Sequence, residues 1–302
     1  MKDQSVAAGS GGVDWSTPEA RSRPVRMGGV STALLGIFVL LALLAPYVAP
    51  FRATALAGDP LEVPDWTHWL GTNLIGQDVM SQLLYGAQVS LFVALTAGGG
   101  TLILGALVGV SSGWAGATID NLLMRVVDLV LVVPKLPLLI VLGAYAGQSL
   151  VAVAVIIALV SWPPTARVLR AQVLSLRRRT HLKAAIGFGA GAFHMLKRHI
   201  LPEVGLLLLA GLISAAGRAV MLEAGLAFLG LGDPSRASWG AMIRDALNFS
   251  GLFFTWSWTW WLLPPVAAIV ALLLCLTLMG TALEQHINPR LSRHEAGGVR
   301  VG

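Results

Sequence analysis

The 302-residue chain has little charge: only 12% of its residues are Asp, Glu, Lys or Arg, whereas 56% are hydrophobic. Soluble domains carry about 25% charged residues, and a soluble chain of this composition would expose large apolar patches. The composition therefore argues against a water-soluble globule. With about 20 residues needed for each membrane-spanning helix, the chain is long enough for six such helices and their loops.

The sequence also lacks the residues of several catalytic sites. Its single cysteine, Cys275, excludes an intrachain disulfide framework and a multi-cysteine metal site. None of the four lysines follows a glycine, as a Walker loop requires, and the six histidines form no His-Glu-x-x-His pair. The spacings within 187–192 and 109–113 match a dinucleotide fingerprint and a serine elbow, but neither adjoins a strand, which favours chance matches. We expect no enzyme activity and no cofactor.

Long apolar runs are what the sequence does contain. They lie near residues 28–50, 86–112, 122–146, 149–166, 202–230 and 259–283. They show no period-two alternation, so helices are predicted and barrel strands are not. The first run is longer than the apolar part of a cleaved signal. Residues 1–27 are too polar to build a core, and we expect a disordered tail there.

The basic residues predict the orientation of these helices. Four of the 21 Lys and Arg residues lie in the N-terminal tail, eight lie between Arg167 and Arg198, and three lie at the C-terminus. Six spans place these three segments on one side of the membrane, and basic loops stay in the cytoplasm. Both termini are therefore predicted to be cytoplasmic. This distribution explains the basic pI of about 10.1 without a nucleic-acid partner.

Small residues recur at every fourth position of the second apolar run, at Gly105, Gly109 and Gly113. Such a stripe lets another helix approach the backbone closely. We interpret it as a packing surface. Four tryptophans between 256 and 261 lie at the start of the last span, where indole side chains favour the membrane interface.

Ionisable residues inside the predicted spans need partners, because unpaired charge at that depth is costly. Asp128 and Lys135 lie in the third span, but they are about 10 Å apart along a helix axis, too far for a direct bond between short side chains. Arg218 and Glu223 lie in the fifth span. Asp128 and Glu223 are candidates for the transport pathway or its gate; a structural ion pair or hydrogen bond is the alternative for Glu223. Pro134 and Pro137, which bracket Lys135, are expected to bend the third span.

The basic segment from Arg167 to Pro202 contains the most specific pattern. It mixes apolar and basic residues at helical spacing, which suits a surface helix bound to anionic lipid. In addition, Ala184, Ala185, Gly189, His199 and Pro202 fit the order Ala-Ala, three residues, Gly, then His-x-x-Pro. This order resembles the EAA loop of ABC importer permeases. Lys183 stands where that loop can carry its glutamate.

Two further stretches resemble one branch of these permeases, the C-type subunit of the dipeptide, oligopeptide and nickel family. The stretches are 68–95, which opens with His-x-Leu-Gly-Thr, and 223–240, which reads EAGLAFLGLG and then Ser-Trp-Gly; the chain ends in a similar Asn-Pro-Arg-Leu at 288–291. The resemblance covers about residues 28–291. Gln77 stands where the family often has Arg, and Asn288 where Asp is usual.

The resemblance implies an all-α integral membrane protein with six transmembrane helices in the type I fold of ABC importer permeases, the MetI-like fold. Its parts would be a cytoplasmic tail (1–27), a first helix (28–50), an extracytoplasmic segment (51–85), a core of five helices (86–285) with a cytoplasmic coupling loop at 170–201, and a cytoplasmic tail (286–302).

The resemblance also implies a function and a set of partners. Such a subunit forms half of a peptide pathway across the bacterial plasma membrane, beside a homologous B-type permease. Two ATPase subunits bind the coupling loop, here Lys183, Ala184, Ala185, Gly189, His199 and Pro202, and an extracytoplasmic binding protein delivers the peptide. The alternative function is a secondary transporter or channel for a small solute, although we find no internal repeat of the kind that many secondary transporters have.

Overall fold

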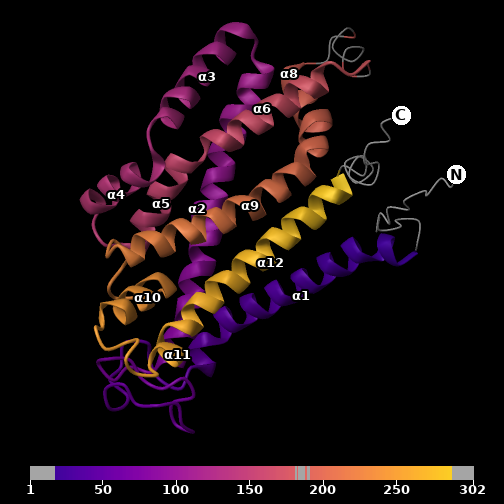
Figure 1. Ribbon diagram of the computed structural model, residues 1–302. Helices are drawn as coiled ribbons and strands as arrows, with labels where there is room; N and C mark the ends of the chain where they lie inside the picture. Colours follow the sequence, from indigo (N-terminus) through magenta and orange to yellow (C-terminus); the bar gives the residue numbers. More distant parts are fainter. Residues whose placement is uncertain (1–17, 181, 183–187, 189–190, 288–302) are drawn as a thin grey trace, which may run out of the picture.

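The computed structural model describes residues 18–180, 182, 188 and 191–287, and its regular elements in these ranges are helices (Figure 1). The longer helices are α1 (Pro18–Val48), α2 (Val79–Trp114), α3 (Ala117–Val132), α4 (Lys135–Ala146), α5 (Leu150–Ser161), α6 (Pro163–Arg177), α9 (Leu201–Phe228), α10 (Trp239–Asn248) and α12 (Leu263–Ile287). Short turns are α8 (Ala192–Met195), the π-helical turn η1 (Leu196–Ile200) and α11 (Trp258–Trp261). Two isolated β-bridges lie in the loop before α2.

Four stretches of helix are long and apolar enough to cross a membrane by themselves: Ser31–Val48, Val79–Trp114, Leu196–Phe228 and Trp258–Leu283. Two bent pairs, α3 with α4 and α5 with α6, bring the number to six if each pair is one span. The expected all-helical membrane protein is therefore confirmed, with six spans as the upper count. The second helix begins at Val79, so the last residues of the segment 51–85, expected to be extracytoplasmic, belong to α2. Asp78 sets this start, because its carboxylate accepts a hydrogen bond from the Ser81 N–H.

The third and fourth spans are not straight. The chain bends by 85° between α3 and α4 and by 44° between α5 and α6. Pro134 and Pro163 stand at these breaks and have no N–H with which to continue the helical ladder. The predicted bend is confirmed at Pro134, whereas Pro137 lies within the first turn of α4. The bend divides the expected span of 122–146 into two helices. Beyond Pro163 the helix continues to Arg177, so the first part of the expected loop at 170–201 is helical.

Helix α2 is the central element, and it contacts α1, α5, α6 and α9. The glycine stripe lies against α6: a Cβ added at Gly109 would come within 2.4 Å of the Ala166 carbonyl oxygen, and one added at Gly105 within 2.6 Å of Thr165. The packing role predicted for these glycines is confirmed, and α6 is the partner helix.

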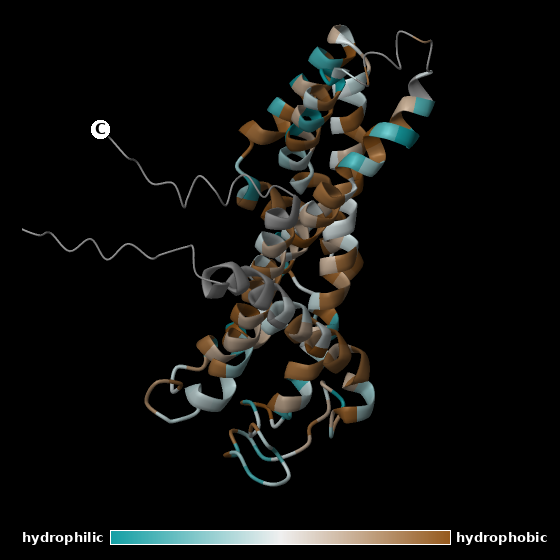
Figure 2. Cartoon of the chain, turned by 90° about the vertical axis from the view of Figure 1, so that its right-hand side faces the viewer, coloured by the Kyte–Doolittle hydropathy of each residue, from teal (hydrophilic) through white to brown (hydrophobic). Residues whose placement is uncertain are grey.

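The two ends of the bundle differ in character, and we name them by their contents. The basic end holds the C-terminal ends of α2 and α6 together with α8 and η1, and the loop end holds residues 49–78 and 229–257. Helices α1 and α12 pack side by side. The N-terminal end of α1 and the C-terminal end of α12 both point toward the basic end (Figure 1). Figure 2 shows hydrophilic residues gathered toward the two ends and hydrophobic residues along the length between them, as expected for helices in a bilayer.

Candidate functional site

At the basic end, one ion pair joins three helices. Arg170 of α6 contacts Asp120 of α3 with two parallel bonds, from Nε to Oδ1 at 2.5 Å and from Nη2 to Oδ2 at 2.6 Å. The Ser112 hydroxyl of α2 donates to the same carboxylate. Bidentate pairs of this kind fix both the distance and the orientation of their partners. Helices α2, α3 and α6 are therefore tied together at this end.

A second arginine of α6 covers the end of α2. The Arg177 Nη1 donates to the backbone oxygens of Gly113 at 2.9 Å and Trp114 at 3.1 Å, and its guanidinium lies 5.1 Å from the centre of the Trp114 ring. The last carbonyls of a helix lack partners within the helix and carry partial negative charge. Arg177 satisfies two of them and stacks on an indole face.

Two further arginines of the basic segment are paired. Arg167 forms an ion pair with Asp128 of α3, and Arg179 Nη1 lies 2.5 Å from Glu203 Oε2 at the start of α9. Asp128 therefore has a partner that the sequence did not indicate. Its side chain is 59% exposed in this chain. Whether it belongs to the transport pathway stays a prediction.

Only part of the predicted coupling loop lies within the described residues. Lys183, Ala184, Ala185 and Gly189 lie outside them. His199 lies on η1, half-buried, and its ring is 5.9 Å from that of His194. Pro202 is exposed in the first turn of α9.

A small buried cluster supports this region. It contains Val173 and Leu176 of α6, Leu182, Met195 before η1, Ile200 and Val204. Both sides of the predicted loop thus share one core, so α6 and the start of α9 are packed together.

At the loop end, a buried histidine fixes the segment before α2. His68 Nδ1 lies 3.0 Å from Asp78 Oδ1, and the imidazole stacks on Phe51 with ring centres 5.1 Å apart. The other oxygen of Asp78 accepts the Ser81 N–H at 2.7 Å. One carboxylate therefore joins the loop to the N-terminus of α2.

The Leu-Gly-Thr residues that follow His68 shape the same segment. Gly71 has a φ of 61°, and an added Cβ would lie 2.4 Å from the Glu62 carbonyl oxygen, so only glycine fits both the conformation and the space. The Thr72 hydroxyl donates to Asp59 O at 2.5 Å and accepts from Glu62 N–H at 2.8 Å. Gln77 has a structural role here, since its side-chain oxygen accepts bonds from Asn73 and Gln82.

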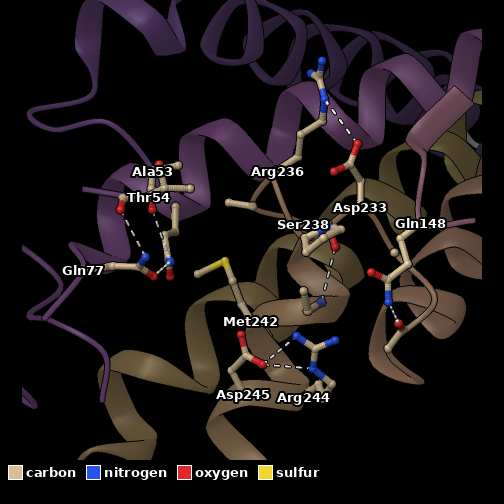
Figure 3. A pocket seen from close by; sticks show the side chains of 16 residues that line it. Ala53, Thr54, Gln77, Gln148, Asp233, Arg236, Ser238, Met242, Arg244 and Asp245 are labelled. Atoms are coloured by element: carbon tan, nitrogen blue, oxygen red, sulfur yellow. Dashed lines mark hydrogen bonds and ion pairs between the residues drawn. The ribbon is translucent and has the colours of Figure 1, made fainter. Parts of the chain in front are cut away.

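A polar pocket of about 160 Å³ opens at the loop end. Its walls come from the loop before α2, from Gln148 and from the segment 230–245 (Figure 3). Its charged side chains are paired with one another: Arg244 Nη2 lies 2.8 Å from Asp245 Oδ1, and Arg236 Nε lies 3.8 Å from Asp233 Oδ2. Gln148 donates to the Gly230 backbone oxygen at 3.1 Å.

Burial raises the pKa of Asp233, but hydrogen bonds from Ser235 and from the backbone, together with the charge of Arg236, outweigh burial and hold that pKa below its ordinary value. Asp233 is therefore ionised at neutral pH, and it supports the turn that leads into α10.

Glu223 lies close to this pocket but faces inward. It is 3% exposed on α9, near Ser238 at the start of α10. Ser238 caps α10 by accepting the Ala241 N–H at 3.3 Å. The next residue, Trp239, is buried and donates from Nε1 to the Leu83 backbone oxygen of α2 at 2.9 Å. In this chain Glu223 is thus part of the junction between α9 and α10, and its role in the pathway stays a prediction.

The sequence analysis missed most of these pairings. It treated the arginines at 167–179 as an orientation signal, whereas the structure pairs four of them with α2, α3 and α9. The available signal was weak: Asp120 and Asp128 lie eight residues apart on one helix, and Arg167 and Arg170 lie three apart on another. Nothing in the sequence showed that these two helices meet.

Comparison with known proteins decides the family. A family model described as the binding-protein-dependent transport system inner membrane component matches residues 102–293. The chain belongs to this family. It is therefore a multi-pass membrane component of a transport system, and the permease resemblance noted from its motifs is confirmed.

Individual members of the family are similar over most of the chain. A Brucella suis protein named as a peptide permease is 38% identical over 75% of this chain and 74% of its own length. A second Brucella suis protein, named as a permease of a peptide transport system, is 36% identical over 90% of this chain and 89% of its own. The Bacillus subtilis dipeptide transport system permease protein DppC is 30% identical over 86% of this chain and 82% of its own length.

One solved structure shares the fold. A chain of the MetNI methionine ABC transporter, in an inward-facing conformation, matches with a TM-score of 0.51 and 20% identity over 70% of this chain and 96% of that one. This similarity confirms the type I permease fold that the resemblance implied.

Proposed function

We propose that this chain is the C-type permease subunit of an ATP-driven importer, and that it forms half of the pathway by which a dipeptide or oligopeptide crosses the plasma membrane. The observation that carries the proposal is the similarity, over 75 to 90% of the chain, to proteins named as peptide or dipeptide permeases. The Bacillus subtilis relative supports dipeptides in particular.

The proposed complex contains a homologous B-type permease, two ATPase subunits and an extracytoplasmic peptide-binding protein. The charge distribution supports the orientation: the basic end faces the cytoplasm with both termini, and the loop end faces the binding protein. The sequence has no Walker loop, so the energy for transport comes from the ATPase subunits.

The contacts at the basic end support a coupling mechanism. Residues 183–199 would bind a groove of an ATPase subunit through their small side chains. On one side this segment continues into α6, which is bound to α2 and α3 through Arg170 and Arg177. On the other side it continues through η1 into α9, and the Arg179–Glu203 pair links the two sides. Movement of the segment would therefore displace α6 and α9 together.

Purification of the tagged chain from host membranes in mild detergent tests the proposal. We expect a second permease and two ATPase subunits to copurify, and peptide-loaded binding protein to stimulate their ATP hydrolysis. Purification of the chain alone, with solute transport in liposomes that needs no ATP, would show instead a secondary transporter or channel.

The coupling segment has its own test. Gly189→Val is expected to abolish peptide-stimulated ATP hydrolysis while the chain still inserts in the membrane. Gly36→Val is the matched control, because nothing lies within 4 Å of a Cβ added at Gly36 on α1. Equal coupling in both variants would count against the segment as the ATPase contact.

A further inference from the structure

A π-helical turn interrupts the helix between the predicted ATPase contact and α9. In η1 the Leu201 N–H donates to the Leu196 carbonyl oxygen, five residues earlier. Just before this turn, the Met195 N–H donates to the Gly191 oxygen at 3.0 Å, with the four-residue spacing of an α-helix. The turn therefore holds one residue more than an α-helical turn does. Such single π-turns within α-helices are rare and occur frequently at functional sites.

Two pairs of side chains show the effect of the extra residue. Met195 and Ile200, five residues apart, are both fully buried in the cluster that joins α6 to the start of α9. The rings of His194 and His199, also five residues apart, have their centres 5.9 Å from each other. In a regular α-helix, residues five apart lie about 140° apart around the axis, so neither pair would share a side of the helix. The π-turn therefore brings both pairs together.

The two sides of the turn are held with different strength. After the turn, Ile200 and Val204 are fully buried, and the Glu203 Oε2 lies 2.5 Å from the Arg179 Nη1. Before the turn, Met195 supplies the buried contact, and a methionine side chain is flexible enough to adapt to changed surroundings. A shift of the segment before η1 would therefore disturb one adaptable contact, whereas a shift of α9 against α6 would break an ion pair and two apolar contacts.

We propose that η1 is a two-state hinge, which converts between a π-helical and an α-helical turn as the ATPase subunits open and close. The inference deepens the proposed coupling mechanism and rests on it. Loss of the extra residue from the turn moves the preceding segment by one residue relative to α9, which is about 1.5 Å along the axis and about 100° around it. The segment thus follows the ATPase subunit between two positions, while α6 and α9 keep their contacts and move as one body.

Deletion of Lys197 tests the hinge, because it leaves the Leu196 carbonyl and the Leu201 N–H four residues apart, the spacing of an α-helix. A turn fixed in one state cannot follow the ATPase subunit through both positions. In the purified complex, we expect the stimulation of ATP hydrolysis by peptide-loaded binding protein to fall at least about tenfold. Lys197→Ala is the matched control, since it loses the same side chain and charge but keeps the five-residue spacing, and its stimulation should equal that of wild type.

Binding of Ni²⁺ to the intact complex, with its affinity tag removed, tests the hinge without a deletion and decides if the deletion variant does not assemble. Imidazole is a good Ni²⁺ ligand, and in the π-turn His194 and His199 lie close enough for one ion to contact both rings. ATP with vanadate, which stops the ATPase subunits in the closed state, should lower the Ni²⁺ affinity at least about tenfold, because the apparent affinity falls with the population of the π-helical state. In His194→Gln one imidazole remains, and the affinity should be low in both states.

Three results would overturn the hinge: equal stimulation of wild type and the Lys197 deletion, equal Ni²⁺ affinity of wild type with and without trapped ATP, or the same fall in affinity in His194→Gln as in wild type. A failure of the proposed function looks different. If the wild-type complex contains no ATPase subunits, or its ATP hydrolysis does not respond to peptide-loaded binding protein, the importer function itself is wrong. A wild-type response that the deletion leaves unchanged contradicts the hinge alone.

Discussion

The indole of Trp239 packs so closely against Gly86 that position 86 of α2 has no room for a side chain. A Cβ added at Gly86 on α2 would lie 2.5 Å from Cδ1 and 2.6 Å from Nε1 of the Trp239 indole. The indole donates to Leu83 O one turn earlier on α2. On the other side of α10, a Cβ added at Gly240 would lie 2.1 Å from the Ala224 carbonyl oxygen of α9. The Ser-Trp-Gly motif therefore attaches α10 to both α2 and α9.

This fit predicts a specific loss of stability. In Gly86→Ala the new methyl group must displace the buried indole or the backbone of α2, and overpacking of this kind costs about 1 to 3 kcal/mol. We expect a lower thermal midpoint of the detergent-solubilised chain, measured by tryptophan fluorescence.

Gly99→Ala is the control for this prediction. Gly99 lies on the same helix, and nothing lies within 4 Å of its added Cβ. Alanine has the better helix propensity, by about 1 kcal/mol, so the control should melt at the wild-type temperature or above it. Equal midpoints for the two variants would mean that α10 does not pack on α2 as described.

The Asp120–Arg170 pair predicts measurable coupling between α3 and α6. Its side chains are 14% and 32% exposed, respectively, so the pair is partly screened by water. A double-mutant cycle with Asp120→Asn and Arg170→Gln should give a coupling free energy of about 1 kcal/mol, more than a typical exposed pair. Denaturant unfolding at low salt measures it.

Arg178→Gln serves as the comparison for Arg170→Gln. Arg178 is exposed one residue after α6, and its side chain forms no ion pair within the described ranges. We expect no coupling between Arg178→Gln and Asp120→Asn. Coupling of the same size for both arginines would show that overall charge, and not the bidentate contact, stabilises this end.

The parts of the fold that depend on local sequence could be predicted. Six apolar runs are visible without a structure because lipid requires long unbroken apolar helices. The glycine stripe at 105–113 indicated a close helix contact, and Pro134 indicated a bend. Each of these signals comes from neighbouring residues or from one helical face.

The parts that depend on which helices meet could not be predicted. Arg170 and Asp120 are 50 residues apart in the sequence, and Trp239 and Leu83 are 156 apart. Many arginines and acids offer equivalent pairings, so composition and spacing alone do not select one. The start of α2 was also placed too late, because Asp78 and Ser81 were not interpreted as a helix cap.

Replacement of Glu223 by Gln should lower the yield of complex less than its replacement by Ala. In Glu223→Gln the side chain keeps nearly the same shape and no longer buries an ionisable carboxyl group, so the yield of complex should stay within about twofold of wild type. Glu223→Ala leaves a cavity at this buried position, and the yield should fall. Quantitative blotting of purified complex and uptake per mole of complex are the two measurements. Normal yield with lost uptake in Glu223→Gln would place the carboxylate in the transport pathway instead.

Asp233 predicts how the loop end responds to acid. Its pKa in the folded chain is lower than the ordinary value of 3.8, so ionised Asp233 stabilises the fold. For a lowered carboxyl pKa this stabilisation is complete above the unfolded pKa and is lost as the pH falls through the folded one. The thermal midpoint of wild type should therefore exceed that of Asp233→Asn by a constant amount at pH 5 to 7, and the difference should shrink below about pH 4.

A second variant identifies the cause of this pH dependence. Ser235 donates to Asp233 Oδ1 from its N–H at 2.9 Å and from its hydroxyl at 2.5 Å. Ser235→Ala removes only the hydroxyl bond, which should raise the pKa of Asp233 toward its ordinary value and move the loss of stability to higher pH. Asp59→Asn, at an exposed position of the same end, should not alter the profile. A difference between wild type and Asp233→Asn that stays constant down to pH 3 would mean that the carboxylate charge does not stabilise the turn, and that the amide replaces it fully.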